Sequence, residues 1–146
     1  MPSPTVEHSL YEQIMTHAPE AIIYADREGK IQLWNDGATR IFGYTAEDAM
    51  GQSLDLIIPE RQRGRHWEGY KKVMQTGVSR YGVDLLSVPA VRKDGSRLSL
   101  EFSVVLVRDE AGQPAGVAAI MRDVTARWQQ DRELKARLAA LEAKST

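Results

Sequence analysis

LSLEFSVVL, residues 98–106, places leucine, phenylalanine or valine at every second position, with serine or glutamate between most of them. A period of two predicts a β-strand with one buried face. The Asp94-Gly95 pair precedes this strand and is a strong hairpin signal, because glycine accepts a positive φ. A longer turn, residues 109–114, follows the strand. We therefore expect an antiparallel meander of three strands between Tyr81 and Asp123.

The two outer strands of this meander differ in character. The third strand, Ala115 to Arg122, is rich in small side chains, which leave room for a ligand above the sheet. The first strand carries Pro89, which lacks the N–H that a central strand needs. We therefore expect the first strand at the edge of the sheet.

The residues before the meander predict a second hairpin and several helices. Their boundaries carry local signals, such as the N-cap residue Asn35 and the terminal glycines Gly43 and Gly77. The expected elements are an amphipathic helix at residues 8–17, strands at 21–25 and 30–34, short helices after Asn35 and Thr45, and a long helix at 60–76. A five-stranded sheet with helices across one face makes this an α+β domain.

Charge and composition argue against several classes of function. With a net charge of −1 and a pI of about 6.3, the chain lacks the basic excess that holds nucleic acid. It has no apolar run of the roughly 20 residues that cross a bilayer, and its N-terminus lacks a signal-peptide profile. We expect a cytoplasmic protein without nucleic-acid or membrane partners. The chain has no cysteine, which removes disulfides and thiolate metal ligands.

Three segments carry more than secondary-structure information: WNDGATRIFGY at residues 34–44, VRKDGS at 91–96 and MRDVT at 121–125. In this order and spacing they resemble the PAS family of sensor domains. The resemblance implies the PAS fold, with strand order 2-1-5-4-3. It places the PAS domain at residues 20–124, between an N-terminal flanking helix at 1–19 and a C-terminal signalling or coiled-coil helix at 125–146.

His66 lies in the run IPERQRGRHWEGY, residues 58–70. This run resembles the segment with the proximal haem ligand in the oxygen-sensing haem domains of rhizobial nitrogen-fixation kinases. The resemblance implies b-type haem with His66 as the metal ligand, since a neutral imidazole can ligate iron. The chain departs from those domains at Leu86, where they carry the arginine that contacts bound oxygen. Selection of oxygen through that hydrogen bond is therefore not expected.

The implied pocket lies between the helix that carries His66 and the inward face of the meander. The expected cofactor-binding residues are His66, Tyr70, Val73, Leu86, Leu100, Phe102, Ile120 and Met121. Met121 is also a candidate sixth ligand, although a thioether on a strand more often belongs to the core.

Flavin is a weaker candidate cofactor than haem. Blue-light flavin photoreceptors and coumaroyl photoreceptors of this fold need a cysteine, which the chain lacks. Trp34 could stack on a flavin ring, but a tryptophan at a strand end is more often a core or interface anchor.

No arrangement of residues predicts an enzyme. The sequence has no recognisable nucleophile constellation and no glycine-rich phosphate loop. Asp84 and Glu101 lie on separate predicted strands, where solvated charges are commoner than a catalytic pair. His8 and His17 have no acidic partner near them in the sequence, and we expect both at the surface.

The C-terminal helix predicted at residues 125–144 carries Leu134, Leu138 and Leu141 at heptad core positions. Leu10 and Ile14 form a similar stripe on the N-terminal helix. These stripes would otherwise face water, so we expect a homodimer through the terminal helices.

Two functions remain open from the sequence. The first is a sensor that binds a small molecule or cofactor in an apolar pocket and signals through its dimeric C-terminal helix. Its effector would be a separate or fused protein such as a kinase. The second is a PAS dimerisation or protein-interaction module without a ligand.

Overall fold

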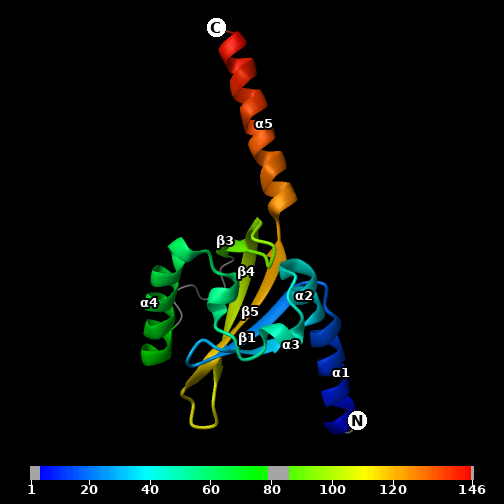
Figure 1. Cartoon of the computed structure of the whole chain (residues 1–146), viewed down its shortest axis with the longest axis vertical. Helices are drawn as coiled ribbons and strands as arrows, with labels where there is room; N and C mark the ends of the chain where they lie inside the picture. The colour runs from blue at the N-terminus through cyan, green and yellow to red at the C-terminus, as the bar shows by residue number, and fades with distance from the viewer. Residues whose placement is uncertain (1–3, 79–85, 146) are drawn as a thin grey trace.

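The computed structural model describes residues 4–78 and 86–145. Its centre is a five-stranded antiparallel sheet in the order β2-β1-β5-β4-β3 (Figure 1). The strands are β1 at Ala21–Asp26, β2 at Ile31–Trp34, β3 at Leu86–Val91, β4 at Arg97–Arg108 and β5 at Pro114–Asp123. The predicted α+β fold and strand order are confirmed. Asp84 and the part of the expected first meander strand before Leu86 lie outside the described residues.

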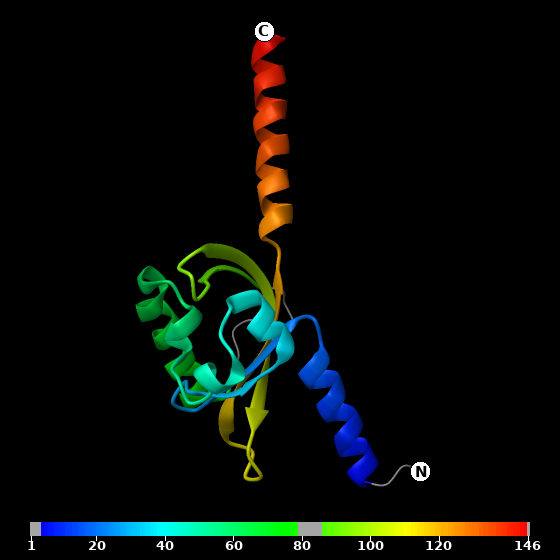
Figure 2. The same ribbon diagram turned by 45° about the vertical axis from the view of Figure 1, so that its right-hand side comes forward.

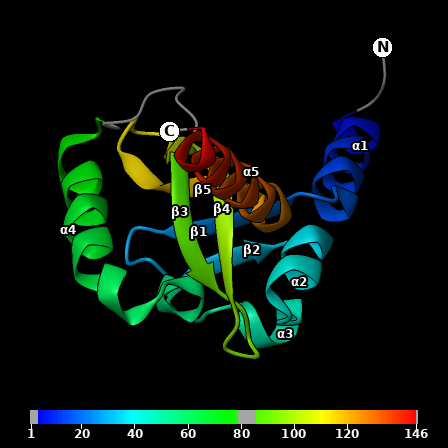
Figure 3. The same cartoon turned by 90° about the horizontal axis from the view of Figure 1, so that it is seen from above.

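The helices are α1 at Pro4–His17, α2 at Asp36–Phe42, α3 at Ala46–Ala49, α4 at Glu60–Thr76 and α5 at Thr125–Lys144, with a 3-10 turn at Leu54–Ile57. Figure 2 shows α2, α3 and α4 over one face of the sheet, with α1 outside this layer. Seen from above, α4 and the α2–α3 pair lie on opposite sides of the view, with strands between them (Figure 3). Helices therefore cover one face of the sheet, as expected.

α1 begins earlier than its apolar stripe predicts, at Pro4 instead of near His8. Proline is tolerated in the first turn of a helix, where its missing N–H has no intrahelical partner to lose. The predicted end at His17 agrees with the structure.

Asn35 holds the junction between α1, β1 and α2. Its Oδ1 accepts hydrogen bonds from the backbone N–H of Ala38, at 3.0 Å, and of Ile22, at 2.8 Å. Its Nδ2 donates to the carbonyl oxygens of Met15, at 2.9 Å, and Glu20, at 3.0 Å. Asn35 is therefore the N-cap that the sequence predicts, and it also ties α1 to the sheet.

The core lies between the sheet and its covering helices. Ala21, Ile23 and Ala25, at alternate positions of β1, are almost completely buried. Phe42 of α2 belongs to the same cluster and exposes no surface. Pro89 lies on the edge strand β3, as predicted, because within residues 4–78 and 86–145 β4 is the one strand that pairs with β3.

α5 extends from the domain as a solvent-exposed helix. Figures 1 and 2 show it projecting away from the sheet, and none of its residues is buried. Among the described residues, no helix combines the length and apolar character that crossing a membrane requires.

Candidate functional site

α4 carries the residues expected to face a ligand. Pro59 precedes the helix, and Gly77 ends it with a φ of +70°, a conformation that glycine adopts without steric cost. Tyr70 and Met74 are buried, whereas His66 and Val73 are partly buried. The helix therefore presents one inward face, which includes the three α4 residues predicted for the site.

Tyr70 pins α4 to the end of β1. Its hydroxyl donates to the carbonyl oxygens of Ala25, at 3.1 Å, and Asp26, at 2.5 Å. Burial raises the pKa of Tyr70, and the nearby charge of Asp26 adds to this. The Tyr70 hydroxyl therefore stays protonated. Because it already donates to carbonyl oxygens of β1, it is not a free donor for a ligand.

Trp67 packs against the β1–β2 turn, next to the contact between Tyr70 and β1. Its Nε1 donates to Asp55 Oδ1 at 2.7 Å. The ring packs so closely on Gly29 that a Cβ there would lie 2.1 Å from two ring carbons. Gly29 also has a φ of +80°. The β1–β2 turn therefore needs glycine for its backbone conformation and for the space that Trp67 fills.

Gln62 and His66, one turn apart on α4, each have a buried side-chain atom without a hydrogen-bond partner among the described residues, and His66 is the one predicted for the site. Its Nδ1 is buried, and none of the described residues forms a hydrogen bond with it. Burial lowers the pKa of His66, and the charge of Asp55 opposes this only in part. The ring lies 4.6 Å from the Trp67 ring and 5.7 Å from the Tyr70 ring, centroid to centroid. His66 is therefore a neutral imidazole held among aromatic rings.

Four predicted site residues share the inward face of the sheet. Register places Leu86 opposite Phe102, and Phe102 opposite Met121. Leu100 and Met121 are 2% and 7% exposed, whereas Leu86 and Phe102 are partly buried. Residues directly opposite in antiparallel strands point to the same side. The sheet therefore brings these four side chains to the side that the helices cover.

Ile120 is placed differently from its prediction. It pairs with Ser103 and Ile22 and is 37% exposed, against 7% for its neighbour Met121. Successive residues of a strand point to opposite faces, so Ile120 cannot share the inward side with Met121. The prediction that Ile120 lines the same pocket is wrong, because it lies on the uncovered face.

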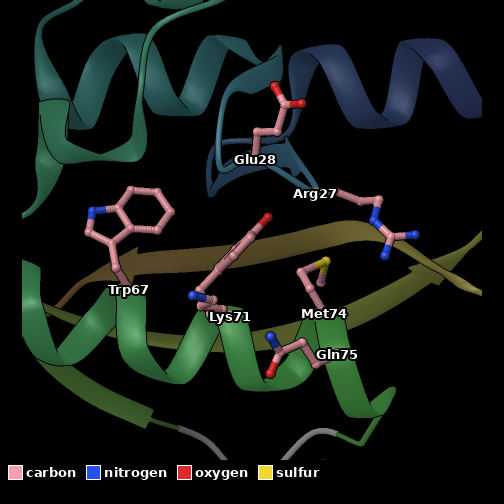
Figure 4. Close-up of a pocket in the computed structure, with 7 residues that line it drawn as sticks. Arg27, Glu28, Trp67, Lys71, Met74 and Gln75 are labelled. Atoms are coloured by element: carbon pink, nitrogen blue, oxygen red, sulfur yellow. The ribbon is translucent and has the colours of Figure 1, made fainter.

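A cleft of about 260 Å³ opens between α4 and the β1–β2 turn (Figure 4). It is lined by Arg27, Glu28, Trp67, Tyr70, Lys71, Met74 and Gln75. Of these, only Tyr70 was a predicted site residue. The sequence places Trp67 and Met74 beside the His66 face, but it contains no local signal that brings the β1–β2 turn to α4.

Other candidate residues have structural roles. Trp34 is 6% exposed, and its Nε1 donates to Thr39 Oγ1 and to the Tyr44 carbonyl, each at 3.1 Å. It is therefore a core anchor and not a free surface for stacking a flavin. His17 is exposed as predicted, but its Nδ1 lies 2.9 Å from Asp36 Oδ2, an acidic partner that the sequence distance concealed.

A model of the family described as the PAS fold matches residues 15–129. The chain belongs to this family. The PAS resemblance of the three sequence segments is confirmed.

Individual relatives are similar over most of this PAS domain. An uncharacterized protein of Azorhizobium caulinodans is 36% identical over 117 residues, which cover 80% of this chain and 16% of that protein. Sensor protein FixL of Bradyrhizobium diazoefficiens is 28% identical over 131 residues, which cover 89% of this chain and 25% of FixL. The chain therefore spans a quarter or less of these two relatives.

A solved structure shows the same fold. The crystal structure of a PAS domain from Colwellia psychrerythraea matches with a TM-score of 0.72 and 22% sequence identity. The match covers 82% of this chain and 98% of that one. PAS domains are sensory modules of signalling proteins, and this chain has that architecture.

The joint between the PAS sheet and α5 is built around Asp123. Its Oδ1 accepts from Thr125 N at 2.9 Å, and its Oδ2 accepts from Arg92 Nη2 at 2.9 Å. Arg92 Nε also donates to the Ile41 carbonyl at 3.2 Å. Ser99 N donates to Thr125 Oγ1 at 2.9 Å. The start of α5 is thereby tied to β4 and, through Arg92, to the end of α2.

Asp123 should make the stability of this joint depend on acidity. Partial burial alone would raise the pKa of Asp123, but the bonds from Thr125 and the charge of Arg92 outweigh it and lower the pKa. The stabilisation is therefore complete above the unfolded pKa of about 3.9 and is lost as pH falls through the lower folded value. We expect Asp123→Asn to cost about 1 kcal/mol at neutral pH and to flatten this acid dependence. Urea unfolding between about pH 2 and pH 6 measures both. An unchanged acid dependence in the variant would show that other carboxylates cause it.

Proposed function

We propose that this PAS domain senses a small molecule or cofactor held between α4 and the inward faces of β3, β4 and β5. The observation that carries the proposal is the buried, unpartnered Nδ1 of His66. A buried polar atom without a partner costs about 1–3 kcal/mol, and in a native protein such an atom calls for an explanation such as a bound ion, a water or a chemical role. The specific occupant we propose is b-type haem with His66 as its axial ligand.

The residues around His66 fit a haem in their chemistry. Burial keeps the imidazole neutral by lowering its pKa, and the neutral ring is the form that ligates iron. The opposite wall is apolar and partly accessible: Val88 pairs with the buried Leu100, yet it remains 39% exposed. Tyr70 and Val73 would pack on one side of the porphyrin, and Leu86, Phe102 and Met121 on the other. A bound haem would supply an iron centre that binds a gas or changes redox state.

We further propose that the signal leaves through α5 of a homodimer, towards a kinase or another fused or separate effector. This is supported by the Asp123 joint, which links α5 to the strand that carries Leu100 and Phe102. An occupant can shift α5 between two arrangements only by its difference in affinity for them. Sensing therefore requires that the contacts between the protein and the occupant differ between the two arrangements of α5.

Hemin binding tests the proposal. Hemin is titrated into the purified chain, and the Soret band is followed for the native sequence, His66→Ala and His17→Ala. We expect the native chain and His17→Ala to give the same Soret spectrum, since His17 is exposed. We expect His66→Ala to shift the band and to weaken binding at least about tenfold, because the iron loses its ligand.

Two results would contradict the haem proposal. An identical Soret spectrum in His66→Ala and the native chain would remove His66 as the ligand. A native chain that takes up no hemin would remove haem altogether.

One observation favours the alternative of a ligand-free interaction module. The cleft of about 260 Å³ beside the β1–β2 turn is not lined by His66, so it does not supply the space that a haem on His66 needs. Tyr70 and Met74 also fill part of the space under α4 with their own side chains. A colourless native chain that takes up neither hemin nor a small ligand, yet remains a dimer, would support this alternative.

A further inference from the structure

The cleft between α4 and the β1–β2 turn has a floor of aromatic and thioether groups. Trp67, Tyr70 and Met74 come from successive turns of α4. The Trp67 and Tyr70 ring centroids lie 5.4 Å apart, and the two planes are inclined by 69°. A third ring on this floor would meet apolar surface and two aromatic rings, and aromatic groups pack favourably with one another.

This floor offers a ligand little hydrogen bonding. Trp67 Nε1 already donates to Asp55, and the Tyr70 hydroxyl already donates to two carbonyl oxygens of β1. The remaining polar atom, the Met74 sulfur, is only a weak acceptor. A molecule that sits on this floor must therefore be apolar on the buried side.

In contrast to the apolar floor, the rim of the cleft carries charged side chains. Arg27 of the turn and Lys71 of α4 both line it, and the described residues supply neither of them with an ion-pair or hydrogen-bond partner. Glu28 is the one carboxylate among the lining residues, and Figure 4 shows it pointing away from α4. Two spare cations at the edge of an apolar floor complement an anionic group at one end of an apolar ligand.

We propose that the cleft binds a small aromatic carboxylate, with its ring on Trp67, Tyr70 and Met74 and its carboxylate at the rim that carries Arg27 and Lys71. An apolar cavity of about 150 Å³ holds benzene, so about 260 Å³ accommodates one ring and a carboxylate and is too small for haem. His66 does not line the cleft. The two proposed sites share Tyr70, but only the haem site depends on His66.

Benzoate, toluene and acetate are the probes that separate the contributions of ring and charge. Each is titrated into the full chain while the indole N–H signals of the three tryptophans are followed by NMR, with Trp67→Phe to assign the Trp67 signal. We expect benzoate to shift the Trp67 signal to saturation. Toluene should bind several-fold more weakly because it leaves the cations unpaired, and acetate should cause no saturable shift.

The cation variants test the assigned contacts. We expect Lys71→Met to weaken benzoate binding about two- to fivefold and to leave toluene binding unchanged. Arg27→Met should act in the same direction, and the two together should reach about tenfold. Lys72→Met is the matched control, since it removes the same charge from the next residue of α4, outside the cleft. Native affinity for benzoate is expected for this control.

Three results would overturn the proposal: no saturable Trp67 shift with benzoate, equal binding of toluene and benzoate, or equal effects of Lys71→Met and Lys72→Met. The same benzoate titration on His66→Ala is expected to match the native chain. Failure of benzoate binding would therefore not contradict the haem proposal. Failure of hemin binding would likewise not contradict the benzoate proposal.

Discussion

Replacing Asn35 by alanine is expected to destabilise the fold by about 3–5 kcal/mol. The side chain is 3% exposed and satisfies the N–H groups of Ala38 and Ile22 and the carbonyl groups of Met15 and Glu20. Alanine makes none of these bonds. The loss of the helix cap and the unpaired buried backbone groups both contribute to the cost. Urea unfolding at 25 °C measures the change in the free energy of unfolding.

Two further variants separate the functions of Asn35. Asn35→Asp keeps an oxygen that can accept from Ala38 and Ile22, but it places a second oxygen against the two carbonyl groups. We expect an intermediate loss of stability. Thr45→Ala removes the exposed N-cap of α3, whose Oγ1 accepts from Asp48 N, and is expected to cost only about 1 kcal/mol. If Asn35→Ala costs no more than Thr45→Ala, the bonds to α1 and β1 contribute nothing beyond capping.

Leu134→Glu combined with Leu141→Glu is expected to convert a dimer into a monomer. Leu134, Leu138 and Leu141 form one stripe on α5 and are 61%, 58% and 64% exposed. An isolated helix of this length is marginal in water without a packed face, so a second copy of α5 is the partner we expect. Two carboxylates on the stripe would repel their counterparts across such an interface. Sedimentation velocity at high micromolar concentration measures the change.

The matched control places the same two charges elsewhere on α5. Gln129→Glu with Ala136→Glu adds carboxylates at positions outside the leucine stripe, and this variant should remain a dimer. Circular dichroism should show a folded sheet in all three proteins. A native chain that sediments as a monomer would refute dimerisation through α5, and dissociation of the control would show that added charge alone is responsible.

Short-range chemistry determined the element boundaries that the sequence predicted well. α4 ends where Gly77 allows a left-handed backbone, and α2 lies between the cap Asn35 and Gly43, as expected. The alternation in β4 likewise predicted that Leu98 and Leu100 are buried. Such features depend on residues within a few positions of one another, so the chain displays them before any tertiary contact is known.

The site was only partly predictable, because only some of its residues are related by a local pattern in the sequence. His66 and Tyr70 fall on one face of α4 by helical spacing alone. In contrast, residues 117–121 of β5 are all apolar, so the sequence could not say which alternate set faces inward. Pairing of β5 with β1 and β4 decided that Met121 is inside and Ile120 outside.

The sequence by itself determined the α+β class, the PAS pattern and the inward face of α4, because periodicity, caps and turns are local properties of the chain. Only the tertiary structure decided which side of β5 faces the helices and that Arg27 and Lys71 line the same cleft. These outcomes depend on strand register and on the contact of Trp67 with Gly29. Both join residues far apart in sequence, and neither leaves a periodic signal in the chain.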